Sequence, residues 1–262
     1  MKYHIASCCR AAIILLFISG FMSPPVACAA TAAPIYVACV RESITRGDTL
    51  KHRLTWAWPA ASQKLLGAPY RVVNFGFSGA TVLKEGGLGY RKKQEFDDAT
   101  QFDPNAVIIT LGSNDTKTNN LESNSTFKID TQSMTPYLGH LTAHLNVYIC
   151  TPPPLAQIHW HESEGVLVRV GIPQKETAAA AVRIPVVHIY DTVMKHIAAK
   201  KPIYYHSQEG LRPNPHGEAP MAKVIYHQVI ERWRDIPGGN TTGRTSLFPI
   251  KRRLGDWRRT VA

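Results

Sequence analysis

Ser43 is the first residue of the chain whose position suggests nucleophilic chemistry. It follows the run 36–40 (YVACV), whose apolar residues around a β-branched centre are typical of a buried strand. Ligands bind at the carboxyl ends of strands in open α/β sheets, so a serine placed there is a candidate nucleophile. A serine after a strand also commonly serves as a turn or helix-cap residue, and the neighbouring segments must decide between the two interpretations.

Three further segments carry glycine or polar residues beside predicted elements. Gly79 lies in a tight loop after the apolar run 72–75, and Asn114 lies in the string GSND after the run 106–111. The string EGLRPN, residues 209–214, precedes the last predicted helix. Simple turn chemistry would explain either Gly79 or Asn114 taken alone. Gly79 and Asn114 follow successive predicted strands, and this placement favours a single shared site.

Short apolar runs alternate five times with helical patterns, and this alternation predicts the elements that must position these residues. The predicted strands are 36–40, 72–75, 106–111, 147–150 and 186–190, and the predicted helices are 55–67, 132–144, 164–182 and 215–233. Residues 84–101 are polar and predict a loop with one short helix. Gly171, Ile172 and Pro173 must bend or break the third helix. Continuously apolar strands that alternate with helices indicate an α/β fold, a three-layer α/β/α sandwich with a five-stranded parallel sheet of flavodoxin-like order.

Taken together, these segments resemble the SGNH, or GDSL-type, hydrolases, which are secreted esterases and acylhydrolases with this fold. The resemblance covers residues 35–229, and VVNFGFSGATVL and VIITLGSNDTK are similar to GDSL-type or sialate O-acetylesterase-like proteins. It implies that Ser43 attacks an ester carbonyl. It also implies that the backbone N–H of Gly79 and the side-chain amide of Asn114 hold the oxyanion, each such donor being worth ~10²–10³ in rate.

Two blocks of the sequence depart from the family pattern. The family's Asp-x-x-His is replaced by Glu209 and Arg212, and the Gly-Asp before the serine is replaced by Arg41 and Glu42. Arginine stays protonated at any useful pH, so Arg212 cannot take the proton from Ser43. Loss of a triad histidine typically costs ~10⁶ in turnover. We therefore expect low activity, with a long cation at position 41 beside the nucleophile.

Other histidines could act instead of the missing base. His206 precedes position 209 by three residues, and His216, which we expect to cap the last helix, lies about one turn from the required place. His159 and His161 are spaced like a metal pair, but no carboxylate cluster accompanies them, and such loop histidines are usually solvated. We expect no metal and no cofactor.

Two functions follow from these residues. The first is a secreted serine esterase or acylhydrolase acting on carbohydrate or small-molecule esters. The second is a catalytically inactive relative that binds an acylated or anionic ligand, with Arg41 and Arg212 as cationic contacts. The fold-level resemblance favours the first function, and the altered residues favour the second.

The chain is expected to contain one domain with an extension at each end. Residues 1–29 have the basic start, short apolar centre and Ala-x-Ala exit of a signal peptide. A retained anchor, or lipid attachment at Cys28, is a weaker alternative, because the apolar centre is short for a membrane span. Residues 30–236 are the hydrolase-like domain, and residues 237–262 are a basic tail that we expect to be disordered. We therefore expect a secreted or periplasmic protein with no stable membrane span.

The formal net charge of +11 is concentrated outside the predicted domain. Much of the excess lies in the tail, and the domain has no basic-aromatic stripe, which argues against a nucleic-acid partner. Beyond the leader, the chain has two cysteines, Cys39 and Cys150. Both fall in apolar runs whose strands are separated by the third strand in the expected order, so we expect two buried, reduced thiols.

Overall fold

The computed structural model divides the chain into two units, Met1–Thr31 and Ala32–Ala262. The residues that it describes are 33–120, 124–139, 146–155, 161–197 and 212–231. The predicted leader, residues 1–29, and the predicted tail, residues 237–262, lie outside the described residues.

A five-stranded sheet in the order β2-β1-β3-β4-β5 forms the centre of the second unit. The strands are β1 (Ile35–Arg41), β2 (Tyr70–Gly76), β3 (Ala106–Ile109), β4 (Asn146–Cys150) and β5 (Val186–Val187). All neighbouring strands are parallel, with Val37 opposite Val72 on β2 and Ala106 on β3. This order confirms the predicted flavodoxin-like sheet, and it brings the carboxyl ends of β1, β2 and β3 together at one edge.

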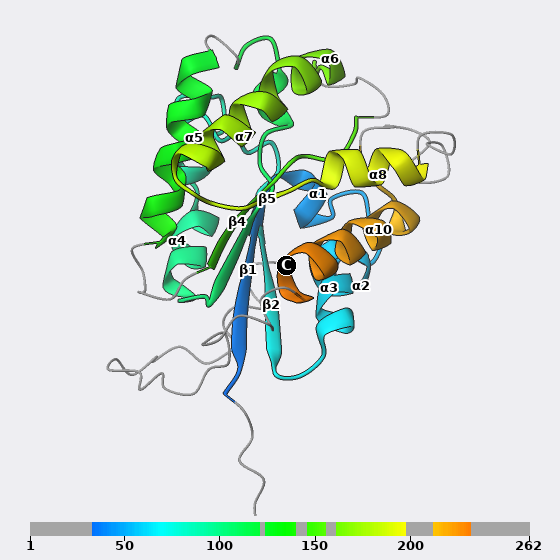
Figure 1. The fold of residues 1–262 in the computed structure, drawn as a ribbon. Coiled ribbons are helices and arrows are strands. Elements are labelled where there is room, and N and C mark those ends of the chain that lie inside the picture. The colour runs from blue at the N-terminus through cyan, green and yellow to red at the C-terminus, as the bar shows by residue number, and fades with distance from the viewer. Residues whose placement is uncertain (1–32, 121–123, 140–145, 156–160, 198–211, 232–262) are drawn as a thin grey trace, which may run out of the picture. The chain divides into compact units, whose positions relative to one another are not determined.

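Helices cover both faces of this sheet, as Figure 1 shows. One face carries α2 (Arg53–Trp56), α3 (Trp58–Leu66), α8 (Ile189–Ile197) and α10 (Pro215–Ile225), and the other carries α4 (Gln94–Gln101), α5 (Asn124–Gly139) and α7 (Ile172–Ala181). The shorter helices are α1 (Ser43–Arg46), α6 (Glu164–Val166), and the one-turn or π-helical segments Tyr90–Lys92, Asn114–Thr116, Leu167–Gly171 and Tyr226–Glu231. The predicted three-layer sandwich is therefore confirmed.

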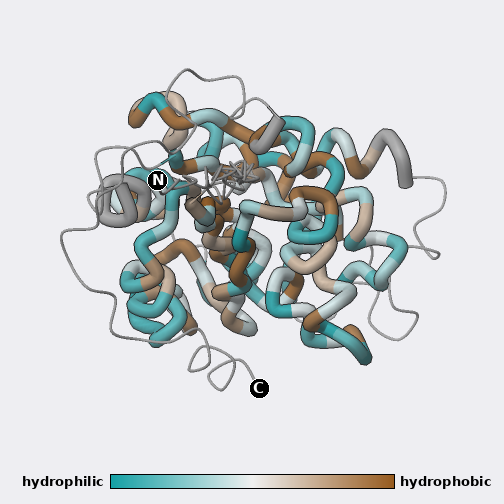
Figure 2. Tube along the Cα trace, turned by 90° about the horizontal axis from the view of Figure 1, so that it is seen from below, coloured by the Kyte–Doolittle hydropathy of each residue, from teal (hydrophilic) through white to brown (hydrophobic). Residues whose placement is uncertain are grey.

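The alternation of side chains along β1 explains the two layers. Val37 and Cys39 belong to a buried cluster with Trp58 and residues of α8 and α10, whereas Ala38 and Val40 belong to a second cluster with Phe96, Phe127 and other residues from α4 and α5. Burial of each large apolar side chain contributes about 1.5–3 kcal/mol. In Figure 2, brown hydrophobic segments run through the middle of the trace, and the peripheral turns are mostly teal.

Several predicted boundaries were wrong. The helix predicted over 55–67 is two helices separated by an extended Ala57, because Pro59 favours a new helical start. The helix predicted from residue 132 begins at Asn124. The strand predicted over 186–190 ends at Val187, because Ile189 already begins α8.

The helix predicted around Pro173 contains a π-helical segment, Leu167–Gly171, between α6 and α7, and the backbone stays right-handed helical through Gly171 and Ile172. Cys39 and Cys150 are free and buried, as predicted, and β3 separates their strands. Within the described ranges, no helix is both long enough and apolar enough to cross a membrane.

Candidate active site

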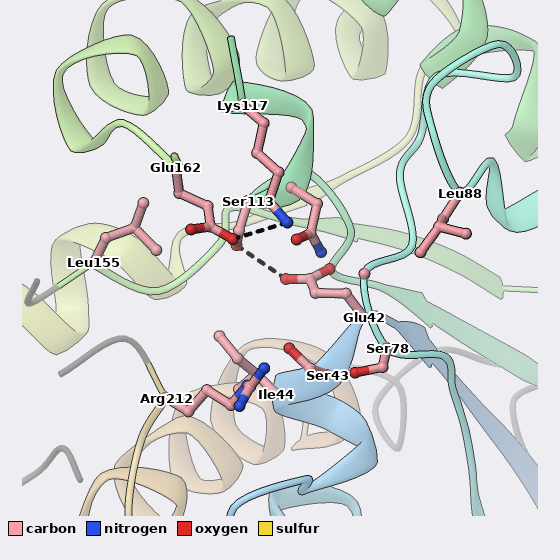
Figure 3. A pocket seen from close by; sticks show the side chains of 12 residues that line it. Glu42, Ser43, Ile44, Ser78, Leu88, Ser113, Lys117, Leu155, Glu162 and Arg212 are labelled. Atoms are coloured by element: carbon pink, nitrogen blue, oxygen red, sulfur yellow. Dashed lines mark hydrogen bonds and ion pairs between the residues drawn. The ribbon is translucent and has the colours of Figure 1, made fainter. Parts of the chain in front are cut away.

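A pocket of about 300 Å³ opens where the first three strands end (Figure 3). It brings together Ser43, Gly79, Asn114 and Arg212, four of the five site residues predicted from the sequence. Glu209, the fifth, lies outside the described residues. The other lining residues are Glu42, Ile44, Ser78, Leu88, Ser113, Lys117, Leu155 and Glu162.

Ser43 is the first residue of α1, and one residue separates it from the end of β1. Glu42 between them is extended, with φ −83° and ψ −156°, so the chain turns sharply from strand into helix at the serine. The backbone oxygen of Ser43 accepts a hydrogen bond from the N–H of Gly47 at 2.9 Å. This short helical turn fixes the backbone of Ser43 at the pocket, where its side chain is 7% exposed.

Gly79 occupies a position that requires glycine. Its φ of +75° lies in the left-handed region, and a Cβ there would come within 2.6 Å of Cδ1 of Leu88. The turn is held by a 3.2 Å hydrogen bond from the N–H of Ala80 to the oxygen of Phe77. Phe77 in turn donates its N–H to the oxygen of Arg41 at 2.9 Å. The loop after β2 is therefore tied to the end of β1 beside Ser43.

Asn114 is buried, and one hydrogen bond holds its side-chain amide while another holds its backbone. Its Nδ2 donates to the oxygen of Ala80 at 3.1 Å, and its backbone oxygen accepts from Nδ2 of Asn120 at 2.8 Å. A side-chain amide nitrogen carries two N–H groups, so the contact with Ala80 orients Asn114 without using both donors. Asn114 thus carries a fixed amide at the pocket wall.

Asp115 binds the loop after β3 to the loop after β2. Its carboxylate accepts the N–H groups of Val82 at 3.1 Å and Leu83 at 3.0 Å. Burial raises the pKa of Asp115 to about 7, although these two hydrogen bonds oppose the shift. The two loops that carry Gly79 and Asn114 are therefore joined to each other by a buried carboxyl group.

Arg41 and Glu42 form a buried ion pair, with Nε and Oε1 2.8 Å apart and exposures of 0% and 1%. Oγ of Ser113 donates to the same Oε1 at 2.9 Å, which links the first and third loops. Nη1 and Nη2 of Arg41 and Oε2 of Glu42 have no hydrogen-bond partner among the described residues. Arg41 does not line the pocket, so the expectations that it crowds Ser43 or contacts a ligand were wrong: the strand alternation and the pairing with Glu42 direct its side chain into the interior.

Arg212 lies in the segment before α10 and lines the pocket on the same side as Ser43 in Figure 3. The helix is capped by Asn214, whose Oδ1 accepts from the N–H groups of His216 at 2.9 Å and Gly217 at 3.2 Å. The prediction that His216 caps this helix was therefore wrong. His216 is exposed and is not a lining residue, so it is not in place to act on Ser43.

The remaining histidine predictions concern metal binding and the second substitute base. His206 and His159 lie outside the described residues. His161 is exposed, and the described ranges hold no group of three or more potential metal ligands among His, Cys, Asp and Glu side chains. Of the described residues that line the pocket, only Glu42 and Glu162 carry a carboxyl group.

Sequence reasoning missed three polar residues around the pocket. Nζ of Lys117 and Oε1 of Glu162 form an ion pair of 3.2 Å on the pocket wall. Lys175, buried on α7, donates from Nζ to the oxygen of Cys150 at 2.7 Å and to the oxygen of Leu111, just before the loop that carries Asn114. Burial lowers the pKa of Lys175 to about 8. The only signal for its burial was its helical spacing from small residues such as Ala178.

Comparison with known proteins gives a consistent result. A family described as GDSL-like lipase/acylhydrolase matches residues 42–219. An acetylxylan esterase of Xylanibacter ruminicola is 28% identical over 208 residues, which are 73% of this chain and 42% of that protein, so the chain spans less than half of this relative.

Solved structures of low sequence identity share the fold. A carbohydrate acetylesterase family member from Sinorhizobium meliloti has a TM-score of 0.58 at 16% identity, covering 75% of this chain and 98% of that one. A lipase/acylhydrolase from Enterococcus faecalis has a TM-score of 0.57 at 18% identity, covering 76% and 96%.

Proposed function

Because the chain belongs to the GDSL-like lipase/acylhydrolase family, we propose that it is an esterase that hydrolyses acyl esters of carbohydrates or small molecules, with low turnover. One observation carries the proposal. Ser43, Gly79 and Asn114 line the same pocket as Arg212, the residue at the family's histidine position. In this proposal Ser43 is the nucleophile and Gly79 and Asn114 are the oxyanion donors, whereas Arg212 cannot act as the base.

In the proposed reaction, Oγ of Ser43 attacks the ester carbonyl and forms a C–O bond, while its proton passes to solvent water, which later protonates the leaving alcohol. The carbonyl π electrons move to oxygen, where the N–H of Gly79 and an Nδ2–H of Asn114 stabilise the negative charge. Collapse of this intermediate breaks the bond to the alcohol and leaves an acyl-serine. Attack by water then releases the acid and restores Ser43.

The slow step is the transfer of the serine proton. A serine hydroxyl keeps its proton at neutral pH and is a weak nucleophile unless a neighbouring base takes that proton. Arg212 is a permanent cation and cannot do so, and Glu209 replaces the family's orienting aspartate with a side chain one methylene longer. The alcohol also leaves without a general acid. Deprotonation of Ser43 without a base and departure of the alcohol without an acid are both slow, so we expect slow ester hydrolysis.

The carbohydrate part of the proposal is supported by the relatives. Two of the matched proteins are described as an acetylxylan esterase and a carbohydrate acetylesterase. A pocket of about 300 Å³ is at the small end for ligand sites, which suits a short acyl group better than a long chain.

We also propose that the protein is exported, with residues 1–29 as a signal peptide and residues 30–236 as the hydrolase domain. The basic start, apolar centre and Ala-x-Ala exit of the leader support this. N-terminal sequencing of the exported protein should find a start near Ala29 or Ala30. An intact Met1 on a membrane-retained protein would contradict it.

The esterase proposal is tested by turnover of a short acyl ester. We expect slow hydrolysis and weak fluorophosphonate labelling, both lost in Ser43→Ala. Turnover that is unchanged in Ser43→Ala would contradict the assignment of the nucleophile. Brisk, Ser43-dependent turnover would show that another group acts as a base.

A second candidate function is binding without turnover, which the place of Arg212 in the pocket favours. In that case the guanidinium would contact the carbonyl or an anionic group of an acylated ligand. Saturable binding of a short acyl ester, with no Ser43-dependent hydrolysis, would favour this candidate.

A further inference from the structure

Lys117 and Glu162 form a charged pair on the wall of the pocket, across from Ser43 and Arg212 (Figure 3). Lys117 follows the helical turn of Asn114, and Glu162 lies in the segment between β4 and α6. Nζ and Oε1 are 3.2 Å apart, and the side chains are 22% and 3% exposed. The pair therefore places a donor and an acceptor side by side in a largely desolvated position.

The pair is not the sole contact between its two loops. The N–H of Ser163, next to Glu162, donates to Oγ1 of Thr116, next to Lys117, at 3.0 Å. Oγ1 of Thr116 also donates to the oxygen of Ser113 at 2.7 Å. These neutral hydrogen bonds already fix both loops to the segment that carries Asn114. A buried ion pair carries a desolvation cost, which a ligand that hydrogen-bonds to both charges would offset.

The chemistry of the pair fits an uncharged polyol. The Lys117 ammonium has three N–H donors, and the carboxylate beside it accepts hydrogen bonds. A sugar hydroxyl both donates and accepts, so two neighbouring hydroxyls on one ring can meet both groups. Leu155 lies next to Glu162 on the same wall in Figure 3 and offers an apolar surface to the C–H groups of such a ring. A simple alkyl or aryl alcohol would leave both charges without these contacts.

We propose that the Lys117–Glu162 pair selects esters of sugars with free neighbouring hydroxyls over esters of simple alcohols. This inference rests on the proposed esterase function, because it assigns the part of the pocket that holds the alcohol. It makes Lys117 and Glu162 specificity-determining residues that act on the ligand rather than on the proton or the oxyanion.

The test measures binding, so that it does not depend on turnover. All proteins carry Ser43→Ala and are full-length. One probe is a methyl pyranoside with one O-acetyl group and free neighbouring hydroxyls, and the other is the same compound with those hydroxyls O-methylated. Affinities are measured by calorimetry or ligand-observed NMR for the parent, Lys117→Met, Lys117→Arg and Lys92→Met. Lys92 is the matched control, because it forms an exposed 2.8 Å ion pair with Glu85 outside the pocket lining.

We expect the parent to prefer the free-hydroxyl probe. Lys117→Met should reduce that preference about tenfold or more, since a hydrogen bond to a charged group is lost. Lys117→Arg should keep most of the preference, and Lys92→Met all of it. The proposal is overturned if the parent shows no preference, or if Lys117→Met retains it. Ester turnover by the protein with Ser43 intact is measured separately, so a failure of the esterase proposal is seen independently.

Discussion

The two sides of the pocket match the family's sequence pattern to different degrees. The donor side is formed by the loops after β1, β2 and β3, and it keeps Ser43, Gly79 and Asn114 in a network of hydrogen bonds between the loops. The base side is the segment before α10, and it presents Arg212. Under the proposed function, the side that would stabilise charge matches the family pattern, and the side that would move a proton does not.

This difference has a physical origin. The donors on the first side are backbone and amide groups fixed by contacts that also join the loops, as Asp115 does for Val82 and Leu83. Their loss would destabilise the fold as well as the site. Arg212 precedes a helix that is capped independently by Asn214, so position 212 can vary without loss of the helix start.

The largest loss of activity should come from the donor side. Asn114→Ala should reduce the residual kcat/KM on a short acyl ester by ~10²–10³, because the side-chain donor is removed from the oxyanion. Asn119→Ala is the control, since Asn119 is exposed and does not line the pocket. A folded Asn114→Ala protein with unchanged activity would show that the Asn114 side chain does not stabilise the oxyanion.

A buried carboxyl group on the α10 side should make stability depend on pH. Burial raises the pKa of Glu218 from 4.5 to about 8, although the N–H of Trp58 and Arg41 oppose the shift. The folded state then binds more protons than the unfolded state between about pH 4.5 and 8. The free energy of unfolding should therefore fall by a few kcal/mol as pH rises through that range.

Urea unfolding at several pH values checks this dependence. Glu218→Gln should reduce the slope and leave the part that comes from Asp115, whose pKa burial also raises, because the amide can still accept the N–H of Trp58, a 2.7 Å hydrogen bond, without titrating. An equally steep pH dependence in the folded Glu218→Gln protein would refute the assignment to Glu218.

A smaller effect is expected at the turn of Gly79. Gly79→Ala should cost about 1 kcal/mol or more from its positive φ alone, and a Cβ would also contact Leu88. Adding Leu88→Ala should relieve the contact but not the backbone strain. Both proteins are compared by thermal unfolding and by kcat/KM. Full recovery in the double variant would mean that space, and not backbone conformation, requires this glycine.

The smallest effect is expected at Ser113. Ser113→Ala removes the 2.9 Å hydrogen bond to Oε1 of Glu42, so about 1 kcal/mol of stability should be lost. Activity should fall only a few-fold, because the donors themselves remain. Chemical unfolding and kcat/KM are the measurements. A drop as large as that of Asn114→Ala would show that Glu42 has a direct part in the reaction.

Much of the sheet and of the donor side could be predicted from the sequence. The strands β1, β3 and β4 contain apolar runs, β2 contains Val72, Val73 and Phe75, and Gly79 and Asn114 follow two of these strands within recognisable strings. The end of β5 could not be predicted, because Ile189 continues the apolar run of the strand. Ile189 and Val193 are buried in the same cluster on one face of α8, and this packing, which assigns Ile189 to a helix, is known only from the fold.

The buried charges could not be predicted, because their partners come from distant parts of the chain. Arg41 ends a strand, where a cation is normally solvated, and its burial depends on the packing of α10 as well as on Glu42. Lys117 and Glu162 lie in loops after different strands, and only the neighbouring order of β3 and β4 brings these loops together. Pair contacts of this kind follow from the fold and are not visible in local patterns.

We propose that the base side of the pocket, and not the donor side, limits activity. The direct test is kcat/KM of Arg212→His on one short acyl ester, with Arg212→Gln as the control that removes the cation without adding a base. We predict a gain of about tenfold or more in Arg212→His only, lost again with Ser43→Ala and rising with pH near the ordinary imidazole pKa of about 6.5. The gain should be partial, because Glu209 is too long to orient the imidazole as the family's aspartate does. A folded Arg212→His protein that is no faster than the parent, or than Arg212→Gln, would contradict the account.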